Sequence, residues 1–348
     1  MTVPFAIIPA YGCDGASLTV SLFAVQATFT SREQWICIGI DGGGSSTKIT
    51  LVDAETGQIL YETQGDASNS HSVGEENARN AILNVIEEAL GHVDSNTEVV
   101  YIAAGISGVS SKNDSERIKA WIQERFPDAM IEVYNDVIAA IMSGTDGVMS
   151  GFALIAGTGS NCMAVDNDRQ ESAGGWGPLL GSFGSGHALG NRALVACCEA
   201  VDGRGPPTLL QPLIENHLGW LPNSFKSNVI PWRYKNGGRE WSDVAGLAPI
   251  VFSAYDQADP VATIIIDEEV KQLALTVRNV ARKMGWTDIK QPHPLVLVGS
   301  LWKQKSFCQK FEQYLMQFNV PYKLAKVTMT PSQGMAKFAL RQYGSRLL

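Results

Sequence analysis

The sequence predicts an α/β protein made of two related domains, each a mixed sheet that starts with three strands and has flanking helices. Two observations support this fold class. Apolar runs at 35–40 and 47–52 flank a turn with three glycines, and apolar runs at 151–156 and 162–165 flank a second glycine-rich turn. Glycine turns let backbone N–H groups approach an anion without obstruction by a Cβ atom. Two such strand–turn–strand units therefore predict two domains that bind one nucleotide.

The first half of the chain alternates strands and helices after three consecutive strands. Apolar residues recur at helical spacing between 78 and 90, which predicts a helix there. Pro127 closes the next helical stretch. The predicted strands are 35–40, 47–52, 59–63, 98–104 and 130–134, and the predicted helices are 74–90, 114–125 and 136–142.

The second half repeats the three-strand opening, with a short third strand near Glu171, and is then rich in helices. Asp259 followed by Pro260 is typical of a helix start. The final helix is expected to pack back on the first domain. The predicted helices are 187–201, 207–218, 241–256, 260–284 and 331–343, and one further apolar strand covers 294–298.

The chain has 348 residues, of which 45% are hydrophobic. A chain of this length and composition is too large for one small hydrophobic core and suits two domains. The expected domains are 35–145, completed by the returning segment 331–348, and 146–330. Residues 1–29 contain no Lys or Arg, so they lack the basic start of a secretory signal. We interpret 1–34 as an extension of unknown role outside the catalytic fold.

The composition argues against several classes of partner. A formal net charge of −8 without a basic stripe argues against nucleic acid. No apolar run reaches the roughly 18 residues that a membrane span needs. The six cysteines form no C-x-x-C motif, which favours buried thiols in a reducing compartment and predicts a cytoplasmic protein.

Two aspartates stand at positions that suit phosphate chemistry. Asp41 ends the first apolar strand, where its carboxylate can serve Mg²⁺ directly or through water. Asp136 starts a helix directly after a strand, and a helix N-terminus favours the charged form of a carboxylate. Asp136 is therefore the candidate general base; the alternative is that it only caps the helix.

Four motifs together resemble those of the N-acetylglucosamine kinases, and the resemblance covers roughly 35–343. That family belongs to the actin-like ATPase and sugar-kinase superfamily and is related to the activator ATPases of benzoyl-CoA reductase. The resemblance implies two ribonuclease-H-like domains with ATP and sugar in the cleft between them. The segment 202–206 is similar to plant-type and other non-animal members. The motifs are Gly157-Thr158-Gly159-Ser160-Asn161-Cys162, Tyr134-Asn135-Asp136, Gly174-Gly175-Trp176-Gly177 and Val298-Gly299-Ser300-Leu301-Trp302-Lys303.

The resemblance also implies the roles of individual residues. Asp41 would hold Mg²⁺ through water, and Asp136 would accept the proton of the attacking sugar hydroxyl. The ATP phosphates would face Gly43, Gly44, Ser45, Gly157, Thr158 and Gly159, and the adenosine would lie against Gly299 and Ser300. The sugar pocket would be lined by Asn69, Ser107, Asp136, Gly175, Trp176 and Ser182.

Ser182 is the main departure from the family, because most members have an Asp at this position. A charge-assisted hydrogen bond is roughly twice as strong as a neutral one, so the substitution weakens the predicted contact with the sugar hydroxyls. It also removes a partner for a protonated amine. The departure therefore argues against free glucosamine as the substrate.

The leading hypothesis is ATP-dependent phosphorylation of N-acetyl-D-glucosamine to its 6-phosphate in amino-sugar salvage, with ATP and Mg²⁺. One alternative is a kinase for another amino sugar, such as glucosamine or N-acetylmannosamine. Another is a sugar- or nucleotide-binding regulator with weakened catalysis. An activator ATPase with an iron–sulfur cluster is disfavoured, because Cys162 follows a phosphate loop and Cys197 and Cys198 lie within a helix. The resemblance is compatible with a homodimer and implies no nucleic-acid or membrane partner.

Overall fold

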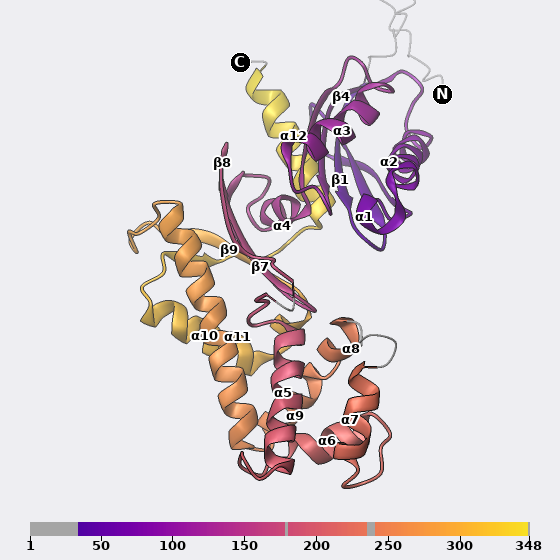
Figure 1. Cartoon of the computed structure of the whole chain (residues 1–348). Helices are drawn as coiled ribbons and strands as arrows, with labels where there is room; N and C mark the ends of the chain where they lie inside the picture. Colours follow the sequence, from indigo (N-terminus) through magenta and orange to yellow (C-terminus); the bar gives the residue numbers. More distant parts are fainter. Residues whose placement is uncertain (1–33, 178–179, 235–240, 347–348) are drawn as a thin grey trace, which may run out of the picture. The chain divides into compact units, whose positions relative to one another are not determined.

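Two five-stranded sheets organise the chain in the computed structural model, which describes residues 34–177, 180–234 and 241–346 (Figure 1). The first sheet has the strand order β3-β2-β1-β4-β5. Its first three strands pair antiparallel, and β4 and β5 extend the sheet in parallel from β1. The strands are β1 (Gln34–Gly42), β2 (Thr47–Asp53), β3 (Ile59–Gly65), β4 (Thr97–Ile106) and β5 (Met130–Asn135).

The second sheet has the order β10-β9-β6-β7-β8, which is the topology of the first sheet repeated. Again the first three strands pair antiparallel, and the last two continue in parallel. This repetition confirms the predicted fold class, with two mixed sheets that each open with three consecutive strands. The strands are β6 (Ser150–Ala156), β7 (Ser160–Asp166), β8 (Arg169–Gly174), β9 (His293–Val298) and β10 (Tyr322–Leu324).

The helices of the first half pack on the first sheet through buried aliphatic side chains. Ile82, Val85 and Ile86 of α2 and Ile118 and Ile122 of α3 join the strand residues in one cluster. Burying such side chains is the main favourable term in folding, at about 1.5–3 kcal/mol each. The helices are α1 (Ser70–Val73), α2 (Glu75–Leu90), α3 (Lys112–Gln123) and α4 (Asp136–Gly144).

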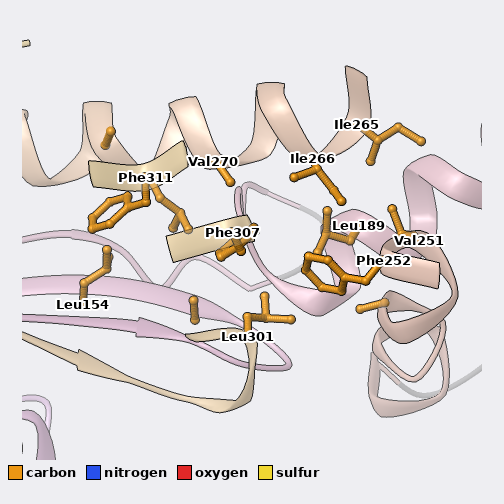
Figure 2. Packing of buried hydrophobic residues seen from close by; sticks show 14 of the residues in the cluster. Leu154, Leu189, Val251, Phe252, Ile265, Ile266, Val270, Leu301, Phe307 and Phe311 are labelled. Atoms are coloured by element: carbon orange, nitrogen blue, oxygen red, sulfur yellow. The ribbon is translucent and has the colours of Figure 1, made fainter. Parts of the chain in front are cut away.

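The helices of the second half form a larger core beside the second sheet (Figure 2). Phe307 and Phe311 of α11 are fully buried with Leu154 of β6 and with Ile266 and Val270 of α10. The helices are α5 (Gly186–Val201), α6 (Leu210–His217), α7 (Phe225–Tyr234), α8 (Trp241–Ala245), α9 (Ala248–Asp256), α10 (Pro260–Lys283) and α11 (Lys305–Gln317).

The last helix, α12 (Pro331–Arg346), packs against β1 of the first sheet and against α4 (Figure 1). Gly39 in β1 allows this approach, because a Cβ atom there would lie 2.1 Å from the backbone oxygen of Ser332. Met335 and Phe338 are buried in a third cluster with residues of β1, β4, α4, β6 and β7. The chain thus completes the core of its first sheet with its last element.

The predicted single helix over 241–256 is wrong, because the structure has two helices, α8 and α9, separated at Gly246 and Leu247. Pro249 stands in the first turn of α9 and has no amide hydrogen, so it cannot donate to the carbonyl of Ala245 and continue α8. A proline at this position instead suits the start of a new helix.

Other elements were not predicted from the sequence. These elements are helices α1, α7 and α11, strand β10 and a 3₁₀ turn at Ser300–Lys303. Most of them are short, but α11 has buried apolar residues at helical spacing, Phe307, Phe311 and Leu315, so its sequence pattern was sufficient to predict it. The expected helix over 207–218 begins later, at Leu210. The proposed extension 1–34 lies outside the described residues except for its last residue, Gln34, which begins β1. None of the helices in the described part of the chain combines the length and apolar character required for a membrane span.

Candidate active site

The first glycine-rich turn joins β1 to β2 and is held in place by backbone hydrogen bonds. The N–H of Ser107 donates to the carbonyl of Gly42 at 2.7 Å, and the N–H of Ser68 donates to the carbonyl of Gly43 at 3.1 Å. A Cβ atom at Gly42 would lie 2.3 Å from the Ser68 hydroxyl oxygen, so a larger residue there would require the Ser68 side chain to move. The next residues of the turn, Gly44 and Ser45, are exposed. The turn is therefore fixed at its base and open at its tip.

Parallel pairing brings the carboxyl ends of β1, β4 and β5 to one edge of the first sheet. Asp41 on β1 is the register partner of Gly105 on β4, and Gly105 is the register partner of Tyr134 on β5. Ser107 directly follows β4, and Asp136 directly follows β5. Three residues that were singled out in separate segments of the sequence therefore lie at the same edge.

The two aspartates at this edge influence each other. Burial raises the pKa of Asp41; Lys48 partly offsets this, whereas Asp136 raises it further. Burial also raises the pKa of Asp136, although hydrogen bonds from the Ser107 side chain and from backbone N–H groups of the first helical turn lower it. The charged forms of both carboxylates are thus partly shielded from water. A cation bound between them and the turn would stabilise these charged forms.

Asn135, and not Asp136, is the N-cap of α4. The Asn135 side chain accepts a hydrogen bond from the N–H of Val137 at 3.0 Å. The alternative that Asp136 serves only as the helix cap is therefore wrong. Its carboxylate is available for another task, at the first position inside the helix, where the helix dipole favours its charged form.

Asn69, Ser107 and Asp136 form a chain of polar side chains. The amide nitrogen of Asn69 donates to the Ser107 hydroxyl at 3.3 Å. Burial raises the pKa of Asp136, and the neighbouring Ser107 side chain lowers it. Asn69 also caps α1, because its side-chain oxygen accepts from the N–H of His71 at 3.0 Å. A Cβ atom at Gly108 would lie 2.6 Å from that oxygen, so glycine is required beside it. The structure thus places Asn69, Ser107 and Asp136 together.

The second glycine-rich turn joins β6 to β7 and lies against the start of α5. The N–H groups of Gly186 and His187 donate to the carbonyls of Gly157 and Thr158, at 2.7 and 3.2 Å. These first-turn N–H groups would otherwise lack partners. Helix α5 binds the carbonyls of the turn, and the N–H of Gly157 donates to the carbonyl of Gly159 at 2.9 Å. The N–H groups of Thr158 and Gly159 are therefore the groups left to face an anion. No atom lies within 4 Å of a Cβ atom built at Gly157, so this side of the turn is open.

Gly299 brings the segment after β9 against the same turn. Its φ of +116° suits only glycine, and a Cβ atom would lie 2.3 Å from the carbonyl oxygen of Ala156. A cavity of about 390 Å³ opens beside this contact. Gly157, Thr158, Gly186, Ser242, Gly246, Phe252, Ser300 and Gln304 are among the residues that line it. Three of the predicted phosphate and adenosine residues of the second half, Gly157, Thr158 and Ser300, therefore share one cavity, whereas Gly159 and Gly299 do not line it.

The residues after β8 also lie near the second turn. The N–H of Gly175 donates to the carbonyl of Ser160 at 3.0 Å. Trp176 is 71% exposed and, with Asn161 and Phe183, lines a smaller cavity of about 170 Å³. Ser182 is only 5% exposed, and its hydroxyl accepts from the N–H of Ser160 at 3.2 Å. Direct contact of Gly175, Trp176 and Ser182 with a sugar stays a prediction.

Asn161 is a site candidate that was not selected from the sequence, although it lies inside the quoted motif of the second turn. Its side-chain oxygen is buried and has no hydrogen-bond partner. The residue also lines a polar cavity of about 440 Å³ together with Ser111, Asn135 and Ser172. Buried polar atoms are nearly always paired in folded proteins, so this oxygen is available to a ligand.

The donor set at the first turn fits Mg²⁺. This ion prefers oxygen ligands and usually binds proteins through one or two carboxylates, several waters and substrate phosphates. Asp41 offers a half-buried carboxylate whose pKa is raised by burial, at the end of the strand that leads into the turn. Asp41 is therefore the residue that would hold the ion.

The cysteines are packing residues in the part of the chain that the structure covers. Cys37, Cys162 and Cys197 are buried, and Cys198 and Cys308 are partly buried. Burial raises the pKa of the Cys162 and Cys197 thiols, so both stay protonated and unreactive near neutral pH. Cys13 lies outside the described residues.

Comparison with known proteins gives consistent results for sequence and fold. Residues 38–336 match the BadF/BadG/BcrA/BcrD ATPase family. An N-acetyl-D-glucosamine kinase of Dictyostelium discoideum is 33% identical over 319 residues, which are 88% of this chain and 98% of that protein. An N-acetylmuramic acid/N-acetylglucosamine kinase of Clostridium acetobutylicum is 32% identical over 257 residues, or 73% of this chain and 81% of that protein.

Among solved structures, a Chromobacterium violaceum protein proposed to be an N-acetylglucosamine kinase is similar over its whole length. The two chains are 25% identical with a TM-score of 0.59, and the match covers 88% of this chain and 98% of that one. The segment that matches the ATPase family contains both glycine-rich turns, Asp136 and Gly299. The comparisons and the geometry therefore concern the same residues.

Proposed function

Because the chain belongs to the BadF/BadG/BcrA/BcrD ATPase family, we propose that it transfers the terminal phosphoryl group of ATP to the 6-hydroxyl of N-acetyl-D-glucosamine. The observation that carries this proposal is the group of Asn69, Ser107 and Asp136 next to Asp41. These side chains gather at one edge of the first sheet, beside a glycine-rich turn. A base, sugar-binding groups and a phosphate-binding turn are the parts that such a reaction needs.

Asp136 acts as the general base. The sugar hydroxyl oxygen forms a bond to the terminal phosphorus of ATP, the bond from that phosphorus to the bridging oxygen breaks, and ADP leaves. The hydroxyl proton passes to the Asp136 carboxylate. Phosphoryl transfer depends mainly on in-line positioning and charge stabilisation, so an aspartate is a strong enough base late in the transfer. Ser107 and Asn69 hold this carboxylate and the hydroxyl in place.

ATP lies between the two glycine-rich turns. Gly43, Gly44 and Ser45 of the first turn and Gly157, Thr158 and Gly159 of the second turn face the phosphates. The N–H groups of Gly43 and Gly157 donate to carbonyls within their own turns, at 2.9 Å each, so the N–H groups of the other four residues bind the phosphates. The adenosine occupies the cavity of about 390 Å³ beside Gly299 and Ser300. Asp41 holds Mg²⁺ through water, and the ion, when bound, neutralises charge on the phosphates.

N-acetyl-D-glucosamine is the preferred sugar. Two relatives that match most of this chain carry this sugar in their names. Ser182 supplies no carboxylate to bind a protonated amine, so an N-acetylated sugar suits this chain better than free glucosamine. Gly175 and Trp176 line the sugar pocket, and the exposed indole of Trp176 offers an apolar face to the pyranose ring.

We retain three further expectations as proposals. The chain folds as domains 35–145, completed by 331–348, and 146–330. It acts in the cytoplasm, and it forms a homodimer.

A coupled ADP-release assay tests the function, with Mg-ATP and N-acetylglucosamine, N-acetylmannosamine, glucosamine or glucose. We expect clear preference for N-acetylglucosamine. The Asp136→Asn variant should lose about 10²–10⁴-fold in kcat, the usual contribution of a general base. Its affinity for ATP, measured by calorimetry without sugar, should stay within about twofold of the native value, because Asn keeps the shape of Asp.

Two results would contradict the proposal. Equal turnover of all four sugars would contradict the assignment of N-acetylglucosamine as the preferred substrate. Native activity in Asp136→Asn would contradict the assignment of Asp136 as the general base. ATP binding without turnover of any sugar would instead support a regulator that binds the ligands without catalysis.

A further inference from the structure

Glu269 is a buried carboxylate on α10, far along the sequence from either phosphate-binding turn. It is 2% exposed, and its two oxygens contact different elements. One accepts from the N–H of Gly184 at 2.5 Å, and the other accepts from the guanidinium of Arg192 on α5 at 3.1 Å. Burying a charge is costly unless it is paired and hydrogen-bonded, so the contacts of this carboxylate strongly favour one arrangement of the chain around it.

Gly184 belongs to a short segment that holds the second glycine-rich turn. Within this segment, 182–184, the Ser182 hydroxyl accepts from the N–H of Ser160 at 3.2 Å. The carbonyl of Phe183 accepts from the Ser160 hydroxyl at 2.6 Å. Both contacts reach the residue that directly follows Gly157-Thr158-Gly159. The segment therefore fixes the end of the turn from one side.

Helix α10 contacts this segment at a second point, one turn beyond Glu269. A Cβ atom at Gly184 would lie 2.1 Å from the Leu273 side chain, and Gly184 has a φ of +72°. The backbone at Gly184 thus packs directly on α10, while its N–H donates to Glu269. Sliding the segment along the helix would break the hydrogen bond and create a steric clash.

Arg192 connects the same carboxylate to the other side of the turn. It lies on α5, whose first N–H groups donate to the carbonyls of Gly157 and Thr158. Glu269 therefore contacts both supports of the turn, the segment 182–184 and helix α5. Resting on the proposed function, in which this turn binds the ATP phosphates, we propose that Glu269 is a positioning residue that sets the conformation of the second phosphate-binding turn.

The neighbouring Glu268 provides a matched control. It also pairs with Arg192, but its side chain is 52% exposed and no hydrogen bond links it to the segment 182–184. Exposed ion pairs contribute little to stability or positioning. Losing Glu268 should therefore leave the turn unchanged, whereas losing Glu269 leaves the N–H of Gly184 buried without a partner.

The experiment compares Glu269→Ala, Glu269→Gln and Glu268→Gln in the full-length enzyme. The Kd for ATP is measured by calorimetry without sugar, and KM for ATP, KM for N-acetylglucosamine and kcat are measured by ADP release. We expect Glu269→Ala to raise Kd and KM for ATP about tenfold and KM for the sugar less than twofold, since one hydrogen bond to a charged group is lost. Glu269→Gln keeps a hydrogen-bond acceptor, so its Kd and KM for ATP should stay within about threefold of the native values. Glu268→Gln should have the native values of both constants.

A second variant, Ser160→Ala, interrupts the series of contacts that runs from Glu269 through the segment 182–184 to Ser160. It does so at the turn and leaves α10 unaltered. Ser160→Ala should also raise the Kd for ATP. The double variant Glu269→Ala/Ser160→Ala should have about the same Kd for ATP as the single variant that binds ATP less tightly, because both changes interrupt the same series of contacts. If Glu269→Ala does not fold, native ATP affinity in Ser160→Ala would overturn the proposal.

Different results separate this proposal from the proposed function. If the native protein binds no ATP, the proposed function fails. If the native protein binds ATP and a folded Glu269→Ala variant binds it equally well, or if KM rises equally for ATP and sugar, the positioning role of Glu269 is wrong while the kinase function stands.

Discussion

Asp41 and Asp136 show how burial and proximity prepare single residues for chemistry. Each carboxylate has its pKa raised mainly by burial, and Asp136 raises the pKa of Asp41 further. A carboxyl group that binds protons more tightly in the folded state loses stabilising free energy as the pH rises from its unfolded pKa through its folded pKa. Near neutral pH both groups therefore lower the stability of the fold, which nevertheless retains them at this edge of the first sheet.

The pH dependence of catalysis is a prediction at this scale. Asp136 must be ionised to accept a proton, so kcat/KM should fall as the pH drops through its raised pKa. The midpoint of the fall in kcat/KM at acidic pH should lie above pH 3.8, the ordinary pKa of aspartate. The check is kcat/KM for N-acetylglucosamine measured from pH 4 upward at saturating Mg-ATP, with circular dichroism at each pH to exclude unfolding. A limb at or below the ordinary value would contradict the raised pKa.

Single elements shape the second glycine-rich turn through contacts that a Cβ atom would prevent. The turn between β6 and β7 is bordered by α5 on one side and by Gly299 on another. Gly299 approaches the carbonyl of Ala156 so closely that any side chain would displace one of the two segments. The glycine is thus required by the packing of β9 on β6, beside the cavity of about 390 Å³.

Gly299→Ala is therefore expected to destabilise the fold and weaken ATP binding. Forcing a non-glycine residue into a φ of +116° costs about 1–3 kcal/mol, before the clash with Ala156 is added. Gly344→Ala is the control, because its Cβ would meet no atom within 4 Å and it lies in α12. That variant should gain up to about 1 kcal/mol from helix propensity. Urea unfolding and ATP calorimetry measure both effects; unchanged stability of Gly299→Ala would refute the packing argument.

At the scale of the whole molecule, the chain builds the same sheet topology twice and then returns to the first sheet. Helix α12 packs on β1 and α4, although almost the entire second half of the sequence lies between them. Phe338 on α12 packs edge to face on Tyr134 of β5, with ring centroids 5.8 Å apart. This contact lies two residues from Asp136, so the last helix supports the strand that leads into the candidate base.

Phe338→Ala tests this support. The side chain is 2% exposed, and replacing a buried Phe by Ala costs about 3–5 kcal/mol of unfolding free energy. Met316→Ala is the control, since Met316 is 60% exposed and surface substitutions usually stay within about 0.5 kcal/mol. Both values come from urea unfolding followed by tryptophan fluorescence. A loss below about 1 kcal/mol in Phe338→Ala would mean that α12 contributes little to the first sheet.

The α/β class, the three-strand opening of each half and most helices could be predicted from the amino-acid sequence alone, because these features depend on local periodicity and turn chemistry. The sequence also identified both glycine-rich turns and the aspartates at strand ends. The break at Gly246 and Leu247 and the short elements such as α7 and β10 were not predicted, because a helical period continues through the break and short segments carry too little pattern.

Which polar residues lie together became apparent only from the packing of the folded chain. The parallel register of β1, β4 and β5 gathers Asp41, Ser107 and Asp136 at one edge. The hydrogen bond between Gly184 and Glu269 joins residues 85 positions apart. No local pattern encodes such pairs, because they arise when separate hydrophobic faces pack and bring their polar neighbours within hydrogen-bonding distance.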